Sequence, residues 1–141
     1  MQIKFKKLNP LAKEPFQTHK TDACFDVYAT SIEDMGDGRI KYGIGLAFEL
    51  PENTRMDFDP RSSIHKTGLL LSNSVGIIDQ EYRGEVCAVF YNVLSELPNY
   101  EIGDRIGQIH IESVNKVNFM EVMELSDTER GAGGFGSTGL K

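Results

Sequence analysis

The chain has 141 residues, the length of one domain, and its 40% hydrophobic and 26% charged residues exclude an intrinsically disordered protein. Twenty-one acidic against fifteen basic residues give a net charge of −6, so we expect binding neither to nucleic acid nor to an anionic membrane. The first residues lack the apolar core of a signal peptide, and no apolar run is long enough to span a bilayer. We therefore expect a cytoplasmic protein with reduced thiols.

Alternation of apolar and polar residues predicts short β-strands along most of the chain. In residues 40–50 every second residue is apolar, which is the pattern of a half-buried strand with one packed face. Turn-forming residues separate this run from its neighbours and favour an all-β sandwich or barrel. Shorter β-like runs lie at residues 3–6, 85–91 and 106–111.

The segment 60–68 places a positive charge and two hydroxyl groups beside a predicted short helix over residues 62–67. Ser62 or Ser63 would cap this helix, and Gly68 would end it in a left-handed conformation. Together with Arg61, such a helix start suits a phosphate group. An ordinary capped turn with an exposed arginine explains the same residues, so both interpretations remain open.

The segment 73–85 has apolar strand residues around a polar turn, which predicts a β-hairpin. Asp79 follows two apolar residues, so its carboxylate would be partly desolvated and could act as a base. Tyr82 offers a flat face to a ring, and Gly76 and Gly84 permit close approach to the backbone. Alternatively, Asp79 is a turn-former and Tyr82 a packing residue.

The end of the chain differs in composition from the rest, since residues 130–141 hold five of the fourteen glycines. We expect a β-domain over 1–129 and a flexible arm over 130–141. The arm carries one cation, one aromatic ring and two hydroxyls, an inventory suited to closing over a nucleotide, with Phe135 stacking on a base. A disordered tail explains the same composition.

The remaining chemistry-bearing residues suggest neither a nucleophilic triad nor a zinc or iron centre. His19, His65 and His110 lack the spacing of metal ligands, and Cys24 and Cys87 lie in strand-like segments where they would be core thiols. A magnesium ion held mainly by substrate phosphates would leave little trace in the sequence.

Five ordered segments between Asp22 and Gly139 resemble the motifs of the homotrimeric dUTPase family. The third is the most specific, and five motifs in order outweigh any single glycine-rich string. Two positions depart from the family pattern, because Cys24 and Gly107 stand where Gly and Ala are usual; we expect the second to be a small change. The segments are 22–29 (DACFDVYA), 60–63 (PRSS), 73–84 (NSVGIIDQEYRG), 103–108 (GDRIGQ) and 130–139 (RGAGGFGSTG).

The resemblance implies an all-β, jelly-roll-like distorted β-barrel with one short helix and a flexible Gly-rich C-terminal arm. It implies Mg²⁺-dependent hydrolysis of dUTP to dUMP and pyrophosphate, which limits uracil in DNA and supplies dUMP for dTMP synthesis. Asp79 would activate the water that attacks the α-phosphorus, and Asp26 would reach the Mg²⁺ through water. The enzyme would be a homotrimer whose sites each use parts of three chains.

The resemblance also implies a set of substrate-binding residues. Tyr82 would lie against the deoxyribose and exclude a 2′-hydroxyl, and the 73–78 segment would read the uracil edge and reject a 5-methyl group. The arm residues would close as a lid. The whole set is Arg61, Ser62, Ser63, Asn73, Gly76, Ile77, Ile78, Tyr82, Gln108, Arg130, Phe135, Gly136, Ser137 and Thr138.

Two other functions compete with this one. A dCTP deaminase shares the fold but needs a glutamate to act on the cytosine ring, whereas residues 78–84 have the dUTPase form. A regulatory protein that binds a protein partner through a nucleotide-gated surface is the second alternative, and it is compatible with catalysis.

Overall fold

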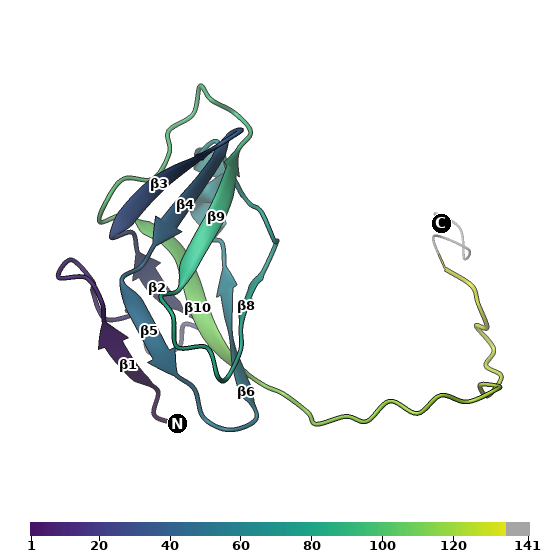
Figure 1. Ribbon diagram of the computed structural model, residues 1–141. Helices are drawn as coiled ribbons and strands as arrows, with labels where there is room; N and C mark the ends of the chain where they lie inside the picture. Colours follow the sequence, from purple (N-terminus) through teal and green to yellow (C-terminus); the bar gives the residue numbers. More distant parts are fainter. Residues whose placement is uncertain (135–141) are drawn as a thin grey trace.

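The computed structural model describes residues 1–134, which are built almost entirely of β-strands (Figure 1). One short 3₁₀ helix, η1, interrupts the strands. No helix in this described part is long and apolar enough to cross a membrane. The elements are β1 (Lys4–Lys7), β2 (Phe25–Tyr28), β3 (Ser31–Gly36), β4 (Arg39–Gly43), β5 (Leu46–Glu49), β6 (Thr54–Asp59), η1 (Ser62–Lys66), β7 (Leu69–Leu71), β8 (Gly76–Ile78), β9 (Cys87–Asn92) and β10 (Arg105–Ser113).

The strands form two four-stranded antiparallel sheets, ordered β2-β10-β6-β8 and β3-β4-β9-β7, and a two-stranded ribbon of β1 and β5. All seven strand pairings within residues 1–134 are antiparallel, which confirms the all-β expectation. Strand β10 lies inside the first sheet, where it pairs with β2 on one side and β6 on the other. This central strand therefore positions residues from three separate segments.

Apolar side chains from all three sheets meet in one core. An aromatic trio forms part of it, because the rings of Tyr42, Phe90 and Tyr100 pack edge to face with centroids 5.7–6.0 Å apart. The Tyr42 hydroxyl donates to the Tyr100 carbonyl at 3.3 Å, which satisfies it inside the core. Each such ring pair contributes about 0.5–1.5 kcal/mol beyond the area that it buries.

The alternating run 40–50 is not one half-buried strand as its pattern predicts. It divides into β4 and β5, which belong to different sheets, and residues 42–48 are buried on both faces. The division falls at Gly45, which has a φ of 68° and donates its N–H to Glu85 Oε1 at 2.7 Å. A Cβ at Gly45 would lie 2.8–3.0 Å from Asn9, Thr30 and Ala12, so glycine permits this crossing between sheets.

The predicted short helix is confirmed as η1, but both of its predicted caps are wrong. Arg61 occupies the N-cap position and makes no side-chain cap hydrogen bond. The helix ends at an extended Thr67, and Gly68 is not in the left-handed region. Glycine is needed at 68 for space instead, because a Cβ there would lie 2.1 Å from the Leu94 carbonyl oxygen.

The predicted hairpin at 73–85 is also wrong. Strand β8 pairs with β6, whereas β7 and β9 pair with each other in the opposite sheet. The turn at 72–75, with Ser74 at a φ of 63°, therefore carries the chain from one sheet to the other. This places β8 at the edge of its sheet.

After β10 ends at Ser113, residues 114–134 contain no strand or helix and extend away from the sheets (Figure 1). The boundary predicted at residues 129 and 130 stays a prediction. Four predicted lid residues lie outside the described residues, namely Phe135, Gly136, Ser137 and Thr138.

The expectation that glycine in place of the usual alanine at residue 107 is a small change is wrong, because the backbone of Gly107 lies against the ring of Phe58. A Cβ at residue 107 would lie 2.1 Å from Phe58 Cζ and 2.6 Å from Cε1. Phe58 is 2% exposed in the core, so its ring has little room to retreat. A large residue at 58 and glycine at 107 therefore fit together.

We predict that Gly107→Ala lowers the free energy of unfolding by about 1–3 kcal/mol, the usual cost of overpacking a core. Adding Phe58→Leu should recover part of this loss, so the double variant should be less destabilised than the sum of the single variants. Urea unfolding measures all three. Gly134→Ala is the control, since nothing lies within 4 Å of a Cβ there; additive losses at 58 and 107 would contradict the coupling.

Candidate active site

An arginine-lined cleft forms where β2, the end of β6 and the start of β10 meet. Asp26 on β2 accepts two arginine N–H groups, from Arg61 Nε at 2.8 Å and from Arg105 Nη1 at 2.9 Å. Arg61 also donates through Nη1 to Ser63 Oγ at 3.1 Å. Two guanidinium groups thus face one carboxylate, which leaves the group with one net positive charge.

The cleft at this position has a volume of about 520 Å³. The Gln108 amide, which donates one hydrogen bond to the Pro60 carbonyl at 3.3 Å, lies at its wall. An arginine-rich, hydroxyl-bearing cleft of this kind suits phosphate oxygens. Its charged and polar lining includes Asp22, Asp26, Arg61, Ser62, Arg105 and Gln108.

Arg105 lines this cleft and donates to Asp26, although the sequence analysis did not include it among the predicted site residues. In the pairing of β10 with β2, Arg105 lies opposite Tyr28, and the register shifts between Arg105 and Gly107. At this irregular position the Arg105 side chain reaches Asp26. The only signal in the sequence is its place within the fourth motif, between Asp104 and Ile106. A bulge of this kind cannot be read from the alternation of residue types.

A second cleft, of about 570 Å³, is formed around β8 and the turn that follows it. Asp79 is exposed in the single chain, so the expected partial desolvation of its carboxylate is wrong for one chain alone. The predicted residues in its wall are Asn73, Gly76, Ile77, Ile78, Asp79 and Tyr82.

The Tyr82 ring is held over the backbone of the same turn. Its hydroxyl donates to the Glu85 carbonyl at 2.9 Å, and its side chain stays 48% exposed. A Cβ at Gly84 would lie 2.4 Å from the Tyr82 hydroxyl oxygen, so glycine at 84 is required for this ring position. The expectation that Gly84 permits a close approach is confirmed.

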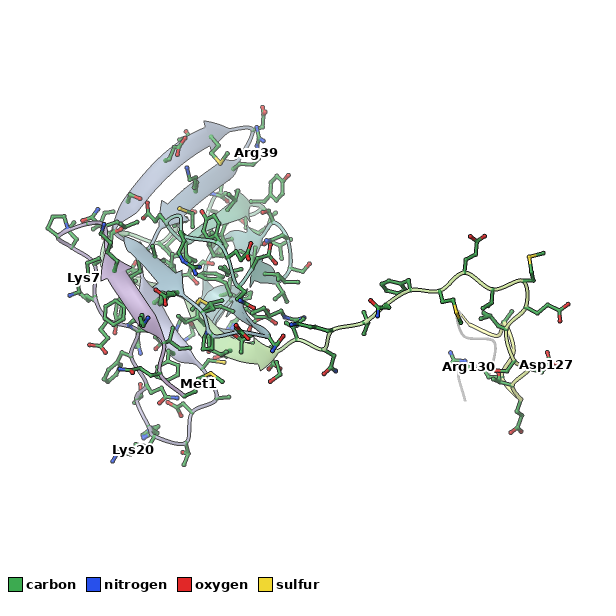
Figure 2. All side chains as sticks on the ribbon, turned by 60° about the horizontal axis from the view of Figure 1, so that its bottom comes forward. Met1, Lys7, Lys20, Arg39, Asp127 and Arg130 are labelled. Atoms are coloured by element: carbon green, nitrogen blue, oxygen red, sulfur yellow. The ribbon has the colours of Figure 1, made fainter. Side chains whose placement is uncertain are left out.

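The predicted site residues are therefore divided among separate places in one chain. The two clefts share no lining residue. Arg130, the third group, lies in the segment beyond the sheets, where its Nε donates to the Gly133 carbonyl at 3.0 Å (Figure 2). A single chain does not bring Asp79, Arg61 and Arg130 into one described cleft.

Comparison with known proteins decides the family. A family profile described as dUTPase matches residues 12–139. The chain belongs to the dUTPase family. It is 42% identical over 144 residues to the deoxyuridine 5′-triphosphate nucleotidohydrolase of Nautilia profundicola, covering 99% of both chains. It is 39% identical to that of Alkaliphilus metalliredigens over 141 residues, covering 99% of this chain and 98% of the relative.

Solved dUTPase structures share the fold. A mutant dUTPase of Staphylococcus bacteriophage 80alpha, solved with dUpNHpp, aligns with a TM-score of 0.81 and 25% identity over 99% of both chains. Another structure of the 80alpha dUTPase, with dUPNHPP, aligns with a TM-score of 0.82 and 27% identity over 99% of both chains. The expected jelly-roll-like β-fold and the assignment to an enzyme family are confirmed.

The sequence pattern predicted that both cysteines are core thiols. Instead, both are only half-buried, and they form no disulfide bond with each other. Burial raises the pKa of Cys24, and the negative charges of Asp59 and Asp26 raise it further. Burial likewise raises the pKa of Cys87, with Glu85 adding to the effect. Both groups are therefore neutral thiols at pH 7.

We predict slow alkylation of both thiols at neutral pH, because only the thiolate is nucleophilic and a raised pKa lowers its population. The iodoacetamide rate per thiol should lie below that of free cysteine at pH 7.5 and rise continuously past pH 9. Intact-mass measurements over a pH series, with peptide mapping, resolve the two sites. A rate plateau below pH 8 at either cysteine would contradict the raised pKa.

Proposed function

We propose that this protein hydrolyses dUTP to dUMP and pyrophosphate, with Asp79 activating the water that attacks the α-phosphorus. Membership of the dUTPase family supports the reaction. The observation that carries the residue assignment is the cleft around β8, where Asp79, Tyr82 and Asn73 converge. An exposed carboxylate next to a ring platform has the arrangement that a general base beside a bound nucleoside needs.

The uracil and the deoxyribose would bind in the β8 cleft. Strand β8 is the edge of its sheet, so N–H and C=O groups on its outer side have no strand partner within residues 1–134. Such an edge can pair with the donor and acceptor groups of a pyrimidine, with Asn73 adding a side-chain amide. Tyr82 would pack on the sugar and leave no space for a 2′-hydroxyl, and the close backbone would reject the 5-methyl group of thymine.

The triphosphate would bind in the arginine-lined cleft, held by Arg61, Ser62, Ser63 and Gln108. Mg²⁺ prefers oxygen ligands and retains waters, and Asp26 fits a water-mediated contact because arginines already occupy both of its carboxylate oxygens. When bound, Mg²⁺ draws negative charge from the phosphates. The arginines give this acidic protein a local positive charge where the substrate is anionic.

The complete site would form in a homotrimer. The 60–63 and 103–108 segments would come from one chain, the β8 turn from a second and the arm from a third, which agrees with clefts that share no residue. Large apolar side chains of the extended segment, including Phe119 at 98% exposure and Met123 at 98%, would be covered by a neighbouring chain. The lid of Arg130, Phe135, Gly136, Ser137 and Thr138 would then close over the nucleotide.

This reaction would limit uracil in DNA and supply dUMP for dTMP synthesis. The relatives named above are nucleotidohydrolases, which favours hydrolysis over the deamination of dCTP. The cytoplasmic location and a regulatory protein partner stay predictions.

The function is tested by incubating the purified protein with dUTP, dCTP, dTTP or UTP, with Mg²⁺ and then with EDTA, and separating the products. We expect dUMP and pyrophosphate from dUTP alone, at a rate that EDTA lowers. Release of ammonia from dCTP would identify a deaminase. Binding of dUTP without turnover would identify a nucleotide-responsive regulator.

Asp79→Asn should abolish turnover and retain dUTP binding, because the amide keeps the shape of the side chain but cannot accept the proton from water. Product analysis gives the rate, and calorimetry gives the affinity. Asp37→Asn is the matched control, an exposed aspartate at a turn outside both clefts. Loss of binding together with activity would count against a role as base.

Two inactive variants should complement each other if the clefts of different chains form one site. We expect purified mixed trimers of Asp79→Asn and Arg61→Gln to regain about a third of wild-type activity, since a cyclic trimer that contains both chain types has one site of three in which both residues are intact. Co-expression with two affinity tags yields the mixed trimers. Activity no greater than that of the parents would place both residues in the same chain's site.

A further inference from the structure

Strand pairing brings three metal-ligating side chains from distant segments together beside the arginine-lined cleft. Cys24 immediately precedes β2, Asp59 ends β6, and His110 lies on β10 between them. Their ligand atoms all lie within 4.8 Å of one another, and all three residues are half-buried. Their separation in the sequence, 24, 59 and 110, explains why spacing alone does not suggest a metal centre.

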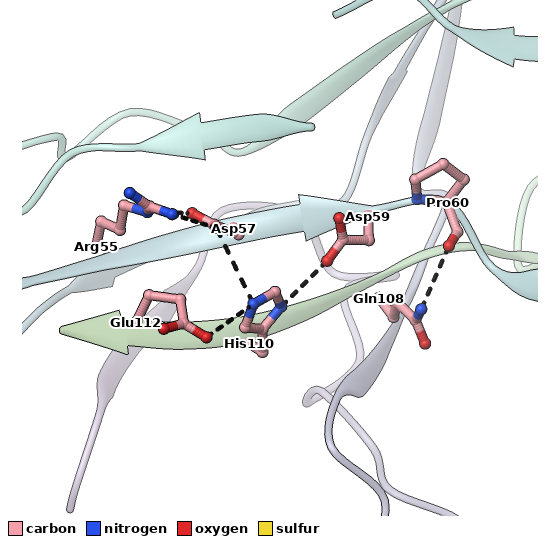
Figure 3. A network of polar contacts seen from close by, with 7 residues as sticks. All are labelled: Arg55, Asp57, Asp59, Pro60, Gln108, His110 and Glu112. Carbon is pink, nitrogen blue, oxygen red and sulfur yellow. Dashed lines mark hydrogen bonds and ion pairs between the residues drawn. The ribbon is translucent and has the colours of Figure 1, made fainter. Parts of the chain in front are cut away.

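The orientation of His110 is that of a metal ligand with supporting carboxylates. Its Nε2 faces Glu112 Oε1 at 3.3 Å and Asp57 Oδ2 at 4.0 Å, on the side away from Asp59 (Figure 3). A proton on Nε2 would therefore be held by acidic groups, which leaves the lone pair on Nδ1. Metal-bound histidines commonly have such a carboxylate behind them.

The other ring nitrogen of His110 has no satisfactory partner. Nδ1 is buried and makes no hydrogen bond, although Asp59 Oδ2 lies 3.1 Å away. A metal ion placed between these two atoms would be bound by both, since imidazole nitrogen and carboxylate oxygen are both common metal ligands. The unpartnered Nδ1 thus points into the same space as the Asp59 carboxylate.

The charges around this space also favour a divalent cation. Asp57 is paired with Arg55, and Asp26 with Arg61 and Arg105. Asp59 and Glu112, by contrast, have no Lys or Arg ion-pair partner within residues 1–134, and His110 is the basic side chain that each one faces. Two carboxylates thus converge on one imidazole ring, with no lysine or arginine ion-paired to either of them in the described residues.

We propose that Cys24, Asp59 and His110 bind a Zn²⁺ ion, through Sγ, a carboxylate oxygen and Nδ1, with water in the fourth position. Mixed sulfur, nitrogen and oxygen ligands select Zn²⁺, whereas Mg²⁺ takes oxygen ligands alone. Tetrahedral Zn²⁺ requires ligand atoms about 3.4–3.6 Å apart. Side-chain movements of about an ångström would therefore bring the three ligand atoms to these distances. The ion would tie β2, β6 and β10 together, and it is distinct from the Mg²⁺ of the proposed reaction.

The test uses the full-length protein, stripped of metal with a chelator under reducing conditions. Zn²⁺ is titrated against a chromophoric chelator in excess Mg²⁺, and Co²⁺ is added separately as a spectroscopic probe. We expect one Zn²⁺ per chain, a raised Tm on Zn²⁺ addition, and a thiolate-to-cobalt charge-transfer band. The measurement needs no nucleotide, so its result is independent of dUTP hydrolysis.

Cys24→Ser and His110→Gln should each weaken Zn²⁺ binding by about 100-fold or more and remove the rise in Tm, since loss of a ligand costs at least as much as loss of its supporting partner. Cys87→Ser and His19→Gln are the matched controls and should bind Zn²⁺ like the wild type. Circular dichroism confirms that each variant is folded, and Cys24→Ala replaces any serine variant that is not. Equal affinity in wild type and Cys24→Ser, or no binding in excess Mg²⁺, would overturn the proposal.

Discussion

The antiparallel pairing of β6 with β10 is the contact on which the rest of this structure depends. It runs from Asp59 opposite Gln108 to Thr54 opposite Ser113. Because side chains alternate across a strand, this register turns Phe58 and Ile109 into the core and Asp59, Gln108 and His110 outward. A slip of one residue in the pairing of the two strands would turn the core side chains outward and the polar ones inward. The packing of Phe58 in the core therefore fixes which polar side chains lie on the outer face.

The outward face of this sheet also bears on how an acidic protein would bind the anionic substrate proposed above. The chain as a whole is acidic, with a net charge of −6. Two arginines converge on one half-buried carboxylate instead, and this pairing holds the guanidinium groups in place at the cleft. Focused cations of this kind act at short range, where solvent and salt screen them least.

Glycine has a steric role at several places that decide the architecture. At Gly45 the chain crosses from one sheet to another, at Gly107 it passes the Phe58 ring, and at Gly84 it leaves space for Tyr82. Each substitution would place a Cβ where another residue already lies. These positions have no common sequence signature, because the group that needs the space comes from elsewhere in the fold.

The sequence by itself determined the β-rich class, the turn punctuation, the short helix and the dUTPase motifs, because these depend on local residue order and alternation. Tertiary structure decided that residues 40–50 form two strands, that β7 and β8 belong to opposite sheets, and that Arg105 reaches Asp26. It also decided the proximity of Cys24, Asp59 and His110. Pairing between distant strands sets all of these contacts, and such pairing is selected by the packing of the whole core rather than by any one segment.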